Sequence, residues 1–506
     1  MNHWMVVPIV LPAMVAALAL LGMRQTLRLG RAVSLLSCLS LLVISLWLLS
    51  QAAEGDVQSY AVGDWPAPFG IILVLDRLAA MMLVLTSVLA VIVLVHVIAT
   101  DLDRRGWHFH PMFQFQLLGL NGAFLTGDLF NLFVFFEVLL IASYGLMLHG
   151  QGAERLKAGI QYVIANLVGS TLFLVAIGLL YGVTGTLNFA DMARRVAALP
   201  EADQGLARAG GLLLLAVFGL KAAVVPLHLW LPRTYSTTSA PAAALFAVMT
   251  KVGVYSIIRV FTLVFGASAG PLAFLAEPWL LPAALVTVVV GFVGLFAGRS
   301  LRELAAFGVI GSTGTLLTAV ALFDVPALAA GLYYLPHTTL AGAALFLVAD
   351  LLIRHRGDLD DRLELGPRFR WMEPIGALYL LCAVAITGLP PLSGFIGKLL
   401  ILTSSEANPA APWIWGVILV TTLVAVLGFA RAGSLLFWKS MEMSELHQPA
   451  QHFARAELMP AAALIGLLSA LTAFALPVTR YMEATAAQLV AQQPYVEAVL
   501  APEVPS

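Results

Sequence analysis

Five ionisable side chains lie inside stretches that are otherwise apolar: Glu137, Lys221, Lys251, His337 and Lys398. A charged group at the centre of a membrane helix costs about 2.5 to 3.5 kcal/mol, so the glutamate and the three lysines together cost on the order of 10 kcal/mol. Carboxylates, amines and imidazoles held at membrane depth are typical of proton relays. These five residues are therefore our candidates for proton transfer.

Glu137 lies in the middle of LTGDLFNLFVFFEVLLIASYG, residues 125–145. One interpretation is a structural ion pair that locks two helices, and the other is a titrating partner for a buried lysine. Proximity to a carboxylate favours the charged form of an amine, whereas burial opposes it. Lys221 is the natural partner, because a proline follows it within the same apolar span.

Lys251 shares a helical face with Tyr255 and Arg259, four and eight residues further on. This spacing predicts a polar stripe, although the lysine could also extend towards a membrane interface. His337 follows a proline in YYLPHTTLAGAALF and is either a packing residue or a proton relay. Lys398 lies close to two prolines, and like Lys221 it is either a titrating group or a lysine that extends towards a membrane interface.

The spans that position these residues recur along the whole chain. The 506 residues are 60% hydrophobic and 11% charged, with a mean hydropathy of +0.94. This composition excludes a soluble multidomain protein, and the net charge of −1 offers nothing to nucleic acid. Windows of about 20 apolar residues predict fourteen helices, near residues 4–22, 32–50, 78–99, 112–127, 129–148, 158–183, 210–230, 242–265, 279–298, 304–323, 327–353, 373–404, 413–438 and 458–478.

The basic residues between these spans are unevenly distributed. Alternate loops, beginning with the loop near residue 24, hold 17 of the 27 lysines and arginines, whereas the other loops, their helix ends and the C-terminal tail hold six. Cytoplasmic loops of membrane proteins are enriched in Lys and Arg. We therefore expect the arginine-rich loops to be cytoplasmic and both termini to lie outside.

Two of the predicted spans are interrupted. GLKAAVVPLHLWLP places Pro226 inside the seventh span, and ITGLPPLSGFIGKLLIL places Pro390, Pro391 and Gly394 inside the twelfth. A proline removes a backbone donor and ends or kinks a helix. Broken helices at membrane depth occur where the backbone is buried in protein or lines a wet cavity. The two breaks suggest an internal repeat with one site in each half.

No cofactor is expected. Cys38 and Cys382 are the only cysteines and both lie in apolar spans, which excludes a disulfide framework, an iron–sulfur cluster or a zinc site built on thiolates. The sequence has no hydrolase triad, ATP-binding loop or redox-cofactor signature. An enzyme acting alone is not expected.

Four motifs carry a resemblance: GDLFNLFVFFEVLLIASYGL, GLKAAVVPLHLWLP, APAAALFAVMTKVGVYSIIRV and ITGLPPLSGFIGKLLIL. Over its full length the chain resembles the antiporter-like membrane subunits shared by respiratory complex I and the Mrp-type multisubunit cation/proton antiporters, and most of all the D-type branch of the Mrp subunits. The resemblance implies an all-α polytopic protein with about fourteen transmembrane helices. It also implies two inverted five-helix repeats in which helices seven and twelve are broken.

The resemblance implies further expectations. The segments would be an N-terminal three-helix segment (1–110), a first repeat (111–266), a second repeat (279–440) and a C-terminal helix and tail (441–506). Glu137, Lys221, Lys251, His337 and Lys398 would form a hydrated proton-transfer axis at the bilayer midplane. Ala341 and Ala344 occupy a region where some relatives carry a lysine, so water would fill more of the route between His337 and Lys398.

The resemblance implies a subunit of a hetero-oligomeric Mrp complex in the bacterial inner membrane, which exchanges cytoplasmic Na⁺ or K⁺ for external H⁺. Its partners would be other membrane subunits, these ions and the lipid bilayer. Lys398, the sequence RTYSTTSAP after the seventh span and the absence of a long lateral helix beyond residue 480 favour this branch. The alternatives are a proton-pumping subunit of complex I or a membrane-bound hydrogenase, and a non-conducting scaffold.

Overall fold

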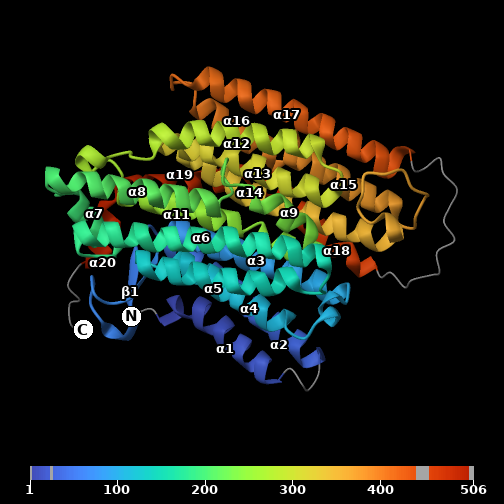
Figure 1. The fold of residues 1–506 in the computed structure, drawn as a ribbon, viewed down its shortest axis with the longest axis horizontal. Coiled ribbons are helices and arrows are strands. Elements are labelled where there is room, and N and C mark those ends of the chain that lie inside the picture. Colours follow the sequence, from blue (N-terminus) through green and yellow to red (C-terminus); the bar gives the residue numbers. More distant parts are fainter. Residues whose placement is uncertain (1–2, 23–26, 440–454, 501–506) are drawn as a thin grey trace.

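The computed structural model describes residues 3–22, 27–439 and 455–500. Arg24, which belongs to one arginine-rich loop, lies outside the described residues. So do residues 440–454 and 501–506, which belong to the predicted C-terminal segment. Most of the long helices run side by side along the long axis of the molecule (Figure 1). The first elements are η1 His3–Met5, α1 Val7–Gly22, α2 Leu27–Ala53, β1 Gln58–Ala61, η2 Val62–Asp64, β2 Ile72–Leu75, α3 Arg77–Ala99 and η3 Leu102–Arg105.

The middle of the chain supplies the elements around the first break. They are α4 Phe109–Leu125, α5 Leu129–Leu148, α6 Ala153–Thr184, α7 Phe189–Ala197, α8 Glu201–Lys221, α9 Trp230–Thr237, α10 Ala240–Phe246 and α11 Met249–Leu263.

The rest of the described chain contains the second break. Its elements are η4 Gly270–Leu272, α12 Glu277–Ala297, α13 Leu301–Val320, α14 Val325–Arg356, η5 Gly357–Leu359, α15 Met372–Thr387, α16 Ser393–Ser404, α17 Ala411–Gly433, η6 Ser434–Trp438, η8 Arg455–Glu457, α18 Met459–Ala473, α19 Ala475–Ala491 and α20 Gln493–Leu500. α14 is almost completely buried and packs against α13, α16, α18, α10, α15 and α19.

The fold class is the predicted one, an all-α membrane protein, but the count of fourteen spans is not confirmed. Within the described residues ten helices are long and apolar enough to cross a membrane, or eleven if one bent pair counts as a single span. The first and fourth predicted spans form the shorter helices α1 and α4, of 16 and 17 residues. The predicted span 458–478 is replaced by α18 and α19, which meet at 79°. Pro477 lies in the first turn of α19, where its missing N–H cannot extend α18.

Both predicted helix breaks are confirmed. α8 ends at Lys221 and α9 begins at Trp230, so Pro226 lies between two helices. α15 ends at Thr387 and α16 begins at Ser393. Gly388 caps α15 with a φ of +73°, a left-handed conformation that glycine adopts without the steric cost of a Cβ.

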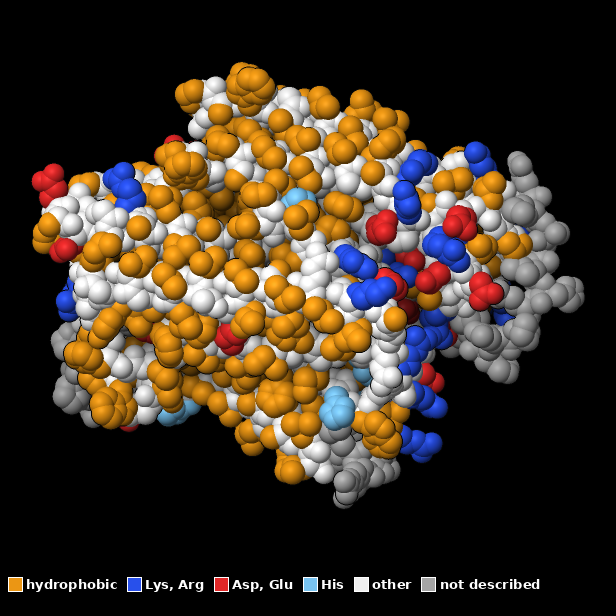
Figure 2. All heavy atoms as spheres, viewed as in Figure 1, with side chains coloured by type: hydrophobic (Ala, Val, Ile, Leu, Met, Phe, Trp, Pro, Cys, Tyr) orange, Lys and Arg blue, Asp and Glu red, His pale blue; other side chains and the backbone are white. Residues whose placement is uncertain are grey.

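The two ends of the helix bundle differ in charge. One end carries the antiparallel β1–β2 hairpin, α7 and α20, and we call it the hairpin end (Figure 1). The opposite end carries η3, η5 and the start of α15, and we call it the arginine-rich end. On the face shown in Figure 2, most acidic and basic side chains gather at the arginine-rich end, whereas hydrophobic side chains cover most of the helices. This distribution agrees with the loop charges read from the sequence.

Candidate functional site

Glu137 lies on α5 and is only half-buried. Its Oε1 accepts a hydrogen bond from the Ser170 hydroxyl on α6. No salt bridge within the described residues includes Glu137 or Lys221, so the structure does not contain the ion pair that the sequence allowed. The glutamate is held by a neutral partner.

Lys221 is buried at the C-terminal end of α8. Its Nζ donates a hydrogen bond of 3.2 Å to Oδ1 of Asn166 and lies 5.7 Å from the centre of the Phe136 ring. Asn166 and Ser170 are one turn apart on α6, so they lie on the same face of that helix. α6 therefore carries one neutral partner of Glu137 and one of Lys221 on the same face, and we call these two side chains the α6 bridge.

The break after Lys221 is held by contacts with other elements. Ala223 has a φ of +57°, a conformation that costs a non-glycine residue roughly 1 to 2 kcal/mol. The N–H of Val225 donates to Thr287 Oγ1 on α12 at 3.0 Å, and Trp230 Nε1 donates to the Leu220 carbonyl at 2.9 Å. These bonds satisfy backbone groups that the broken helix leaves free.

Gly253 lets α11 approach this break closely. A Cβ added at Gly253 would lie 2.6 Å from the backbone nitrogen of Ala222 and 2.9 Å from the carbonyl carbon of Lys221. The helix that carries Lys251 therefore packs directly against the end of α8. The sequence does not indicate this contact, because glycine is common in membrane helices for several reasons.

Lys251 is completely buried on α11. Its Nζ donates hydrogen bonds of 3.3 Å to Thr250 Oγ1 and to Thr313 Oγ1 on α13. The alternative of a lysine that extends to a membrane interface is not what the structure shows. The predicted stripe is present, since Arg259 donates to the hydroxyl of Tyr255 at 3.1 Å.

His337 is buried on α14 and faces the second break. Its Nδ1 lies 2.9 Å from the hydroxyl of Ser393, the first residue of α16. The hydroxyl of the adjacent Thr338 donates to Ser312 Oγ on α13 at 2.6 Å. His337, Thr338, Ser312 and Ala341 line a cavity of about 10 Å³, which has room for about one water molecule.

Lys398 is buried on α16 beyond the same break. Its Nζ donates to the Thr387 carbonyl at 2.7 Å and to Thr422 Oγ1 on α17 at 2.8 Å, and it lies 5.3 Å from the centre of the Phe292 ring. The carbonyl of Thr387 is free to accept because α15 ends there. The second break thus supplies a hydrogen-bond acceptor for the Lys398 ammonium group.

The three buried lysines share one property: each donates its hydrogen bonds to neutral oxygens. Sequence reasoning found the charged residues but missed their partners, which come from other helices. Asn166 and Ser170 could have been found from the sequence, since two polar residues spaced by four inside an apolar span indicate a polar helix face. Thr313, Ser393 and Thr422 could not, because isolated hydroxyls are common in membrane helices.

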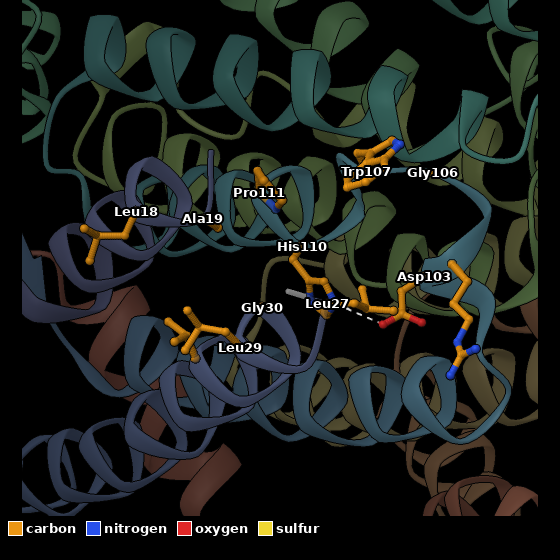
Figure 3. Close-up of a pocket in the computed structure, with 12 residues that line it drawn as sticks. Leu18, Ala19, Leu27, Leu29, Gly30, Asp103, Gly106, Trp107, His110 and Pro111 are labelled. Atoms are coloured by element: carbon orange, nitrogen blue, oxygen red, sulfur yellow. Dashed lines mark hydrogen bonds and ion pairs between the residues drawn. The ribbon is translucent and has the colours of Figure 1, made fainter. Parts of the chain in front are cut away.

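A cavity of about 430 Å³ lies apart from these residues, between the facing ends of α1, α2 and α4. Figure 3 shows its mainly apolar lining, with Leu18, Leu27 and Trp107 around it and the contact between His110 and Asp103 at one side. Arg31 also donates to Asp103, at 2.6 and 2.7 Å. Both carboxylate oxygens of Asp103 are therefore occupied by neighbouring side chains of this chain.

No group of three or more His, Cys, Asp or Glu residues in the described part of the chain could hold a metal ion. Cys38 and Cys382 are buried, unpaired thiols on α2 and α15.

The chain is similar in sequence to known membrane proteins. Residues 126–428 match the family model described as NADH:quinone oxidoreductase/Mrp antiporter, TM. The chain is 40% identical to the D subunit of a probable K⁺/H⁺ antiporter of Rhizobium meliloti, over 99% of this chain and 98% of that protein. It is 35% identical to the D subunit of a Na⁺/H⁺ antiporter of Bacillus subtilis, over 99% and 100%.

Solved structures show the same fold. A chain of the Mrp complex from Dietzia sp. DQ12-45-1b superimposes with a TM-score of 0.85 and 26% identity, covering 99% of this chain and 100% of that one. A chain of respiratory complex I from Thermus thermophilus superimposes with a TM-score of 0.76 and 24% identity, covering 96% and 99%. The second likeness concerns the fold alone.

Proposed function

The chain belongs to the NADH:quinone oxidoreductase/Mrp antiporter family of membrane proteins, and from this premise we propose that it is a proton-translocating subunit of a multisubunit Na⁺(K⁺)/H⁺ antiporter. It would be a secondary transporter subunit rather than an enzyme. The relatives named as antiporter subunits align over nearly their full lengths. The alternative, a subunit of complex I or a membrane-bound hydrogenase, fits less well.

The observation that carries the proposal is the set of neutral partners around the buried lysines. A carboxylate next to an ammonium group stabilises its protonated form. An ammonium group that donates only to hydroxyl, amide and carbonyl oxygens loses weaker interactions when its proton leaves. Lys221, Lys251 and Lys398 all have this environment. Such groups can bind and release protons in turn.

The proposed route runs from Glu137 across the α6 bridge to Lys221, and then to Lys251, His337 and Lys398. Gly253 brings the helix of Lys251 against the break at Lys221. Water in the cavity beside His337 would connect segments that side chains do not span. The first and second repeats, residues 111–266 and 279–440, would each contribute one broken helix to this axis.

The complex would lie in a bacterial inner membrane with the arginine-rich end in the cytoplasm and both termini outside, as the excess of basic residues in the loops at that end suggests. Other membrane subunits would complete it, since the structural relatives come from multisubunit complexes. Half-buried Glu137 lies on a helix with exposed apolar side chains such as Ile141 and Phe130, a surface suited to lipid or to a neighbouring subunit.

The test is cation-driven proton flux in everted membrane vesicles that contain the assembled complex. Glu137→Gln and Lys221→Met should each lower flux at least tenfold, while Lys157→Met should leave it unchanged. Lys157 is a suitable control because its side chain is 65% exposed and pairs with Glu154 at the surface. Wild-type flux in an assembled Lys221→Met complex would refute the proposal.

A further inference from the structure

The polar stripe of α11 continues beyond Lys251 towards the hairpin end. Tyr255 and Arg259 follow at intervals of four residues, so Arg259 lies about 12 Å further along the helix axis. Both are buried, and the Tyr255 hydroxyl donates to the Phe124 carbonyl at 2.6 Å. Tyr255 and Arg259 thus extend the polar face of α11 from Lys251 towards one end of the bundle.

An ion pair ends this polar face. Arg259 Nη1 and Nη2 lie 2.5 and 2.9 Å from the two carboxylate oxygens of Asp76, and both side chains are 3% exposed. Asp76 also caps α3 by accepting from the N–H of Ala79. The proposed axis does not use this pair, although it is the next charged group on the helix of Lys251.

The C-terminal helices cover the pair. The Tyr495 ring on α20 lies 5.2 Å from the Arg259 guanidinium carbon, and the Tyr495 hydroxyl is buried without a hydrogen-bond partner within the described residues. Gln492 donates to the Thr262 carbonyl at 2.5 Å. Between these groups lies a cavity of about 10 Å³ lined by Asp76, Arg259, Gln492 and Tyr495, which admits about one water molecule.

We propose that the Asp76–Arg259 pair, covered by α19 and α20, is a seal that prevents protons on Lys251 from leaving towards the hairpin end. A guanidinium does not release its proton in proteins. Both oxygens of Asp76 are occupied by the guanidinium, so the carboxylate does not take up a proton without breaking the pair. Neither partner can relay a proton while the pair is intact, and the Tyr495 ring and Gln492 pack over it.

The inference rests on the proposed function, because a seal matters only if Lys251 carries protons. It adds a consequence for direction: protons on Lys251 must continue to His337 and Lys398. Asp76 and Arg259 are positioning residues, since neither carries the proton.

The test is the passive collapse of an imposed pH gradient across liposomes that contain the purified, assembled complex in choline salt, without Na⁺ or K⁺. The wild-type complex should hold the gradient. The double variant Asp76→Asn with Arg259→Gln, which removes both charges, should collapse the gradient at least tenfold faster. Adding Lys251→Met should abolish this leak.

The variant Arg259→Lys separates a seal from a structural lock. A lysine keeps the positive charge beside Asp76 but can release its proton, so this variant should also leak, whereas a pair that serves only as a structural lock would be rescued by the retained charge. The matched control is Arg302→Gln with Asp361→Asn, which removes a partly buried pair at the arginine-rich end, 2.9 Å between Nη2 and Oδ1. This control should not leak.

Assembled complexes that hold the gradient in either the double variant or Arg259→Lys would overturn the seal, as would a leak that persists without Lys251. The proposed function fails on a separate measurement, namely if Lys251→Met alone leaves cation-driven exchange intact. The two failures are therefore distinguishable.

Discussion

Replacing Asn166 with leucine should disable Lys221 without touching a charged residue. The Lys221 ammonium group lies 3.2 Å from the Asn166 amide oxygen and 5.7 Å from the centre of the Phe136 ring. A hydrogen bond to a charged group is worth about 1.5 to 3 kcal/mol. Because about 1.4 kcal/mol corresponds to a factor of ten, the protonated lysine should become roughly 10- to 150-fold less populated relative to the neutral form.

Proton flux should fall by a similar factor if Lys221 must be protonated in every cycle. The assay is cation-driven collapse of a pH gradient in liposomes with the assembled complex, followed with an entrapped pH-sensitive dye at several pH values. Flux should partly recover at lower pH, because a higher proton concentration compensates for the weaker ammonium site. Thr171→Val is the matched control, since Thr171 is exposed on the same helix and donates only to the Leu167 carbonyl of its own helix, at 3.0 Å.

A structural role for Asn166 would give a different result. It would lower the yield or melting temperature of the complex but leave the flux per assembled complex, and its pH profile, unchanged. Wild-type flux at every pH in assembled Asn166→Leu would refute the α6 bridge.

Three further predictions concern other parts of the axis. Gly253→Ala should lower the stability of the complex by about 1 to 3 kcal/mol and reduce flux, because the added Cβ would lie 2.6 Å from the Ala222 nitrogen. Gly178→Ala should not destabilise the complex, since a Cβ at Gly178 would have nothing within 4 Å. Equal melting temperatures for the two variants would contradict the close approach of α11 to the end of α8. Ser393→Ala should reduce flux by removing the partner of His337 Nδ1 at 2.9 Å, whereas Ser404→Ala, which breaks only a bond within α16, should not. Burial raises the pKa of Asp128, which precedes α5, to about 6, against weaker opposing hydrogen bonds from Asn131 and Phe130. Because this folded-state pKa lies above the unfolded value, the stability of the wild type should decline by on the order of 3 kcal/mol from pH 4 to 7 relative to that of Asp128→Asn. Melting temperatures of the two proteins that change in parallel with pH would contradict this.

The spans and both helix breaks could be predicted from the sequence because they are local features. Long apolar runs, prolines and the loss of a backbone donor act within a few residues. The burial of the three lysines could be predicted for a related reason, since a lysine inside an apolar span is conspicuous on its own. The sequence did not predict the β1–β2 hairpin, because its short strands lie in a segment that resembles a loop. It did not predict the bend between α18 and α19, because their apolar residues resemble one continuous span.

The partners of the charged residues could not be predicted from one sequence. Lys221 and Asn166 are 55 residues apart, and Arg259 and Asp76 are 183 apart. Helical periodicity shows which residues share a face but does not show which faces of distant helices meet. Glu137 and Lys221 illustrate this limit, because each has its hydrogen-bond partner on α6 and the two form no direct ion pair.

Lys251→Met tests the proposed proton route most directly, because transport should be lost without a loss of stability. A buried ammonium group with only threonine partners is costly, so a methionine of similar shape should leave the melting temperature unchanged or raise it. We predict that cation-driven proton flux of this well-folded complex is lost. Wild-type flux in the same complex would show that the buried lysine does not carry protons, and would contradict the proposed route.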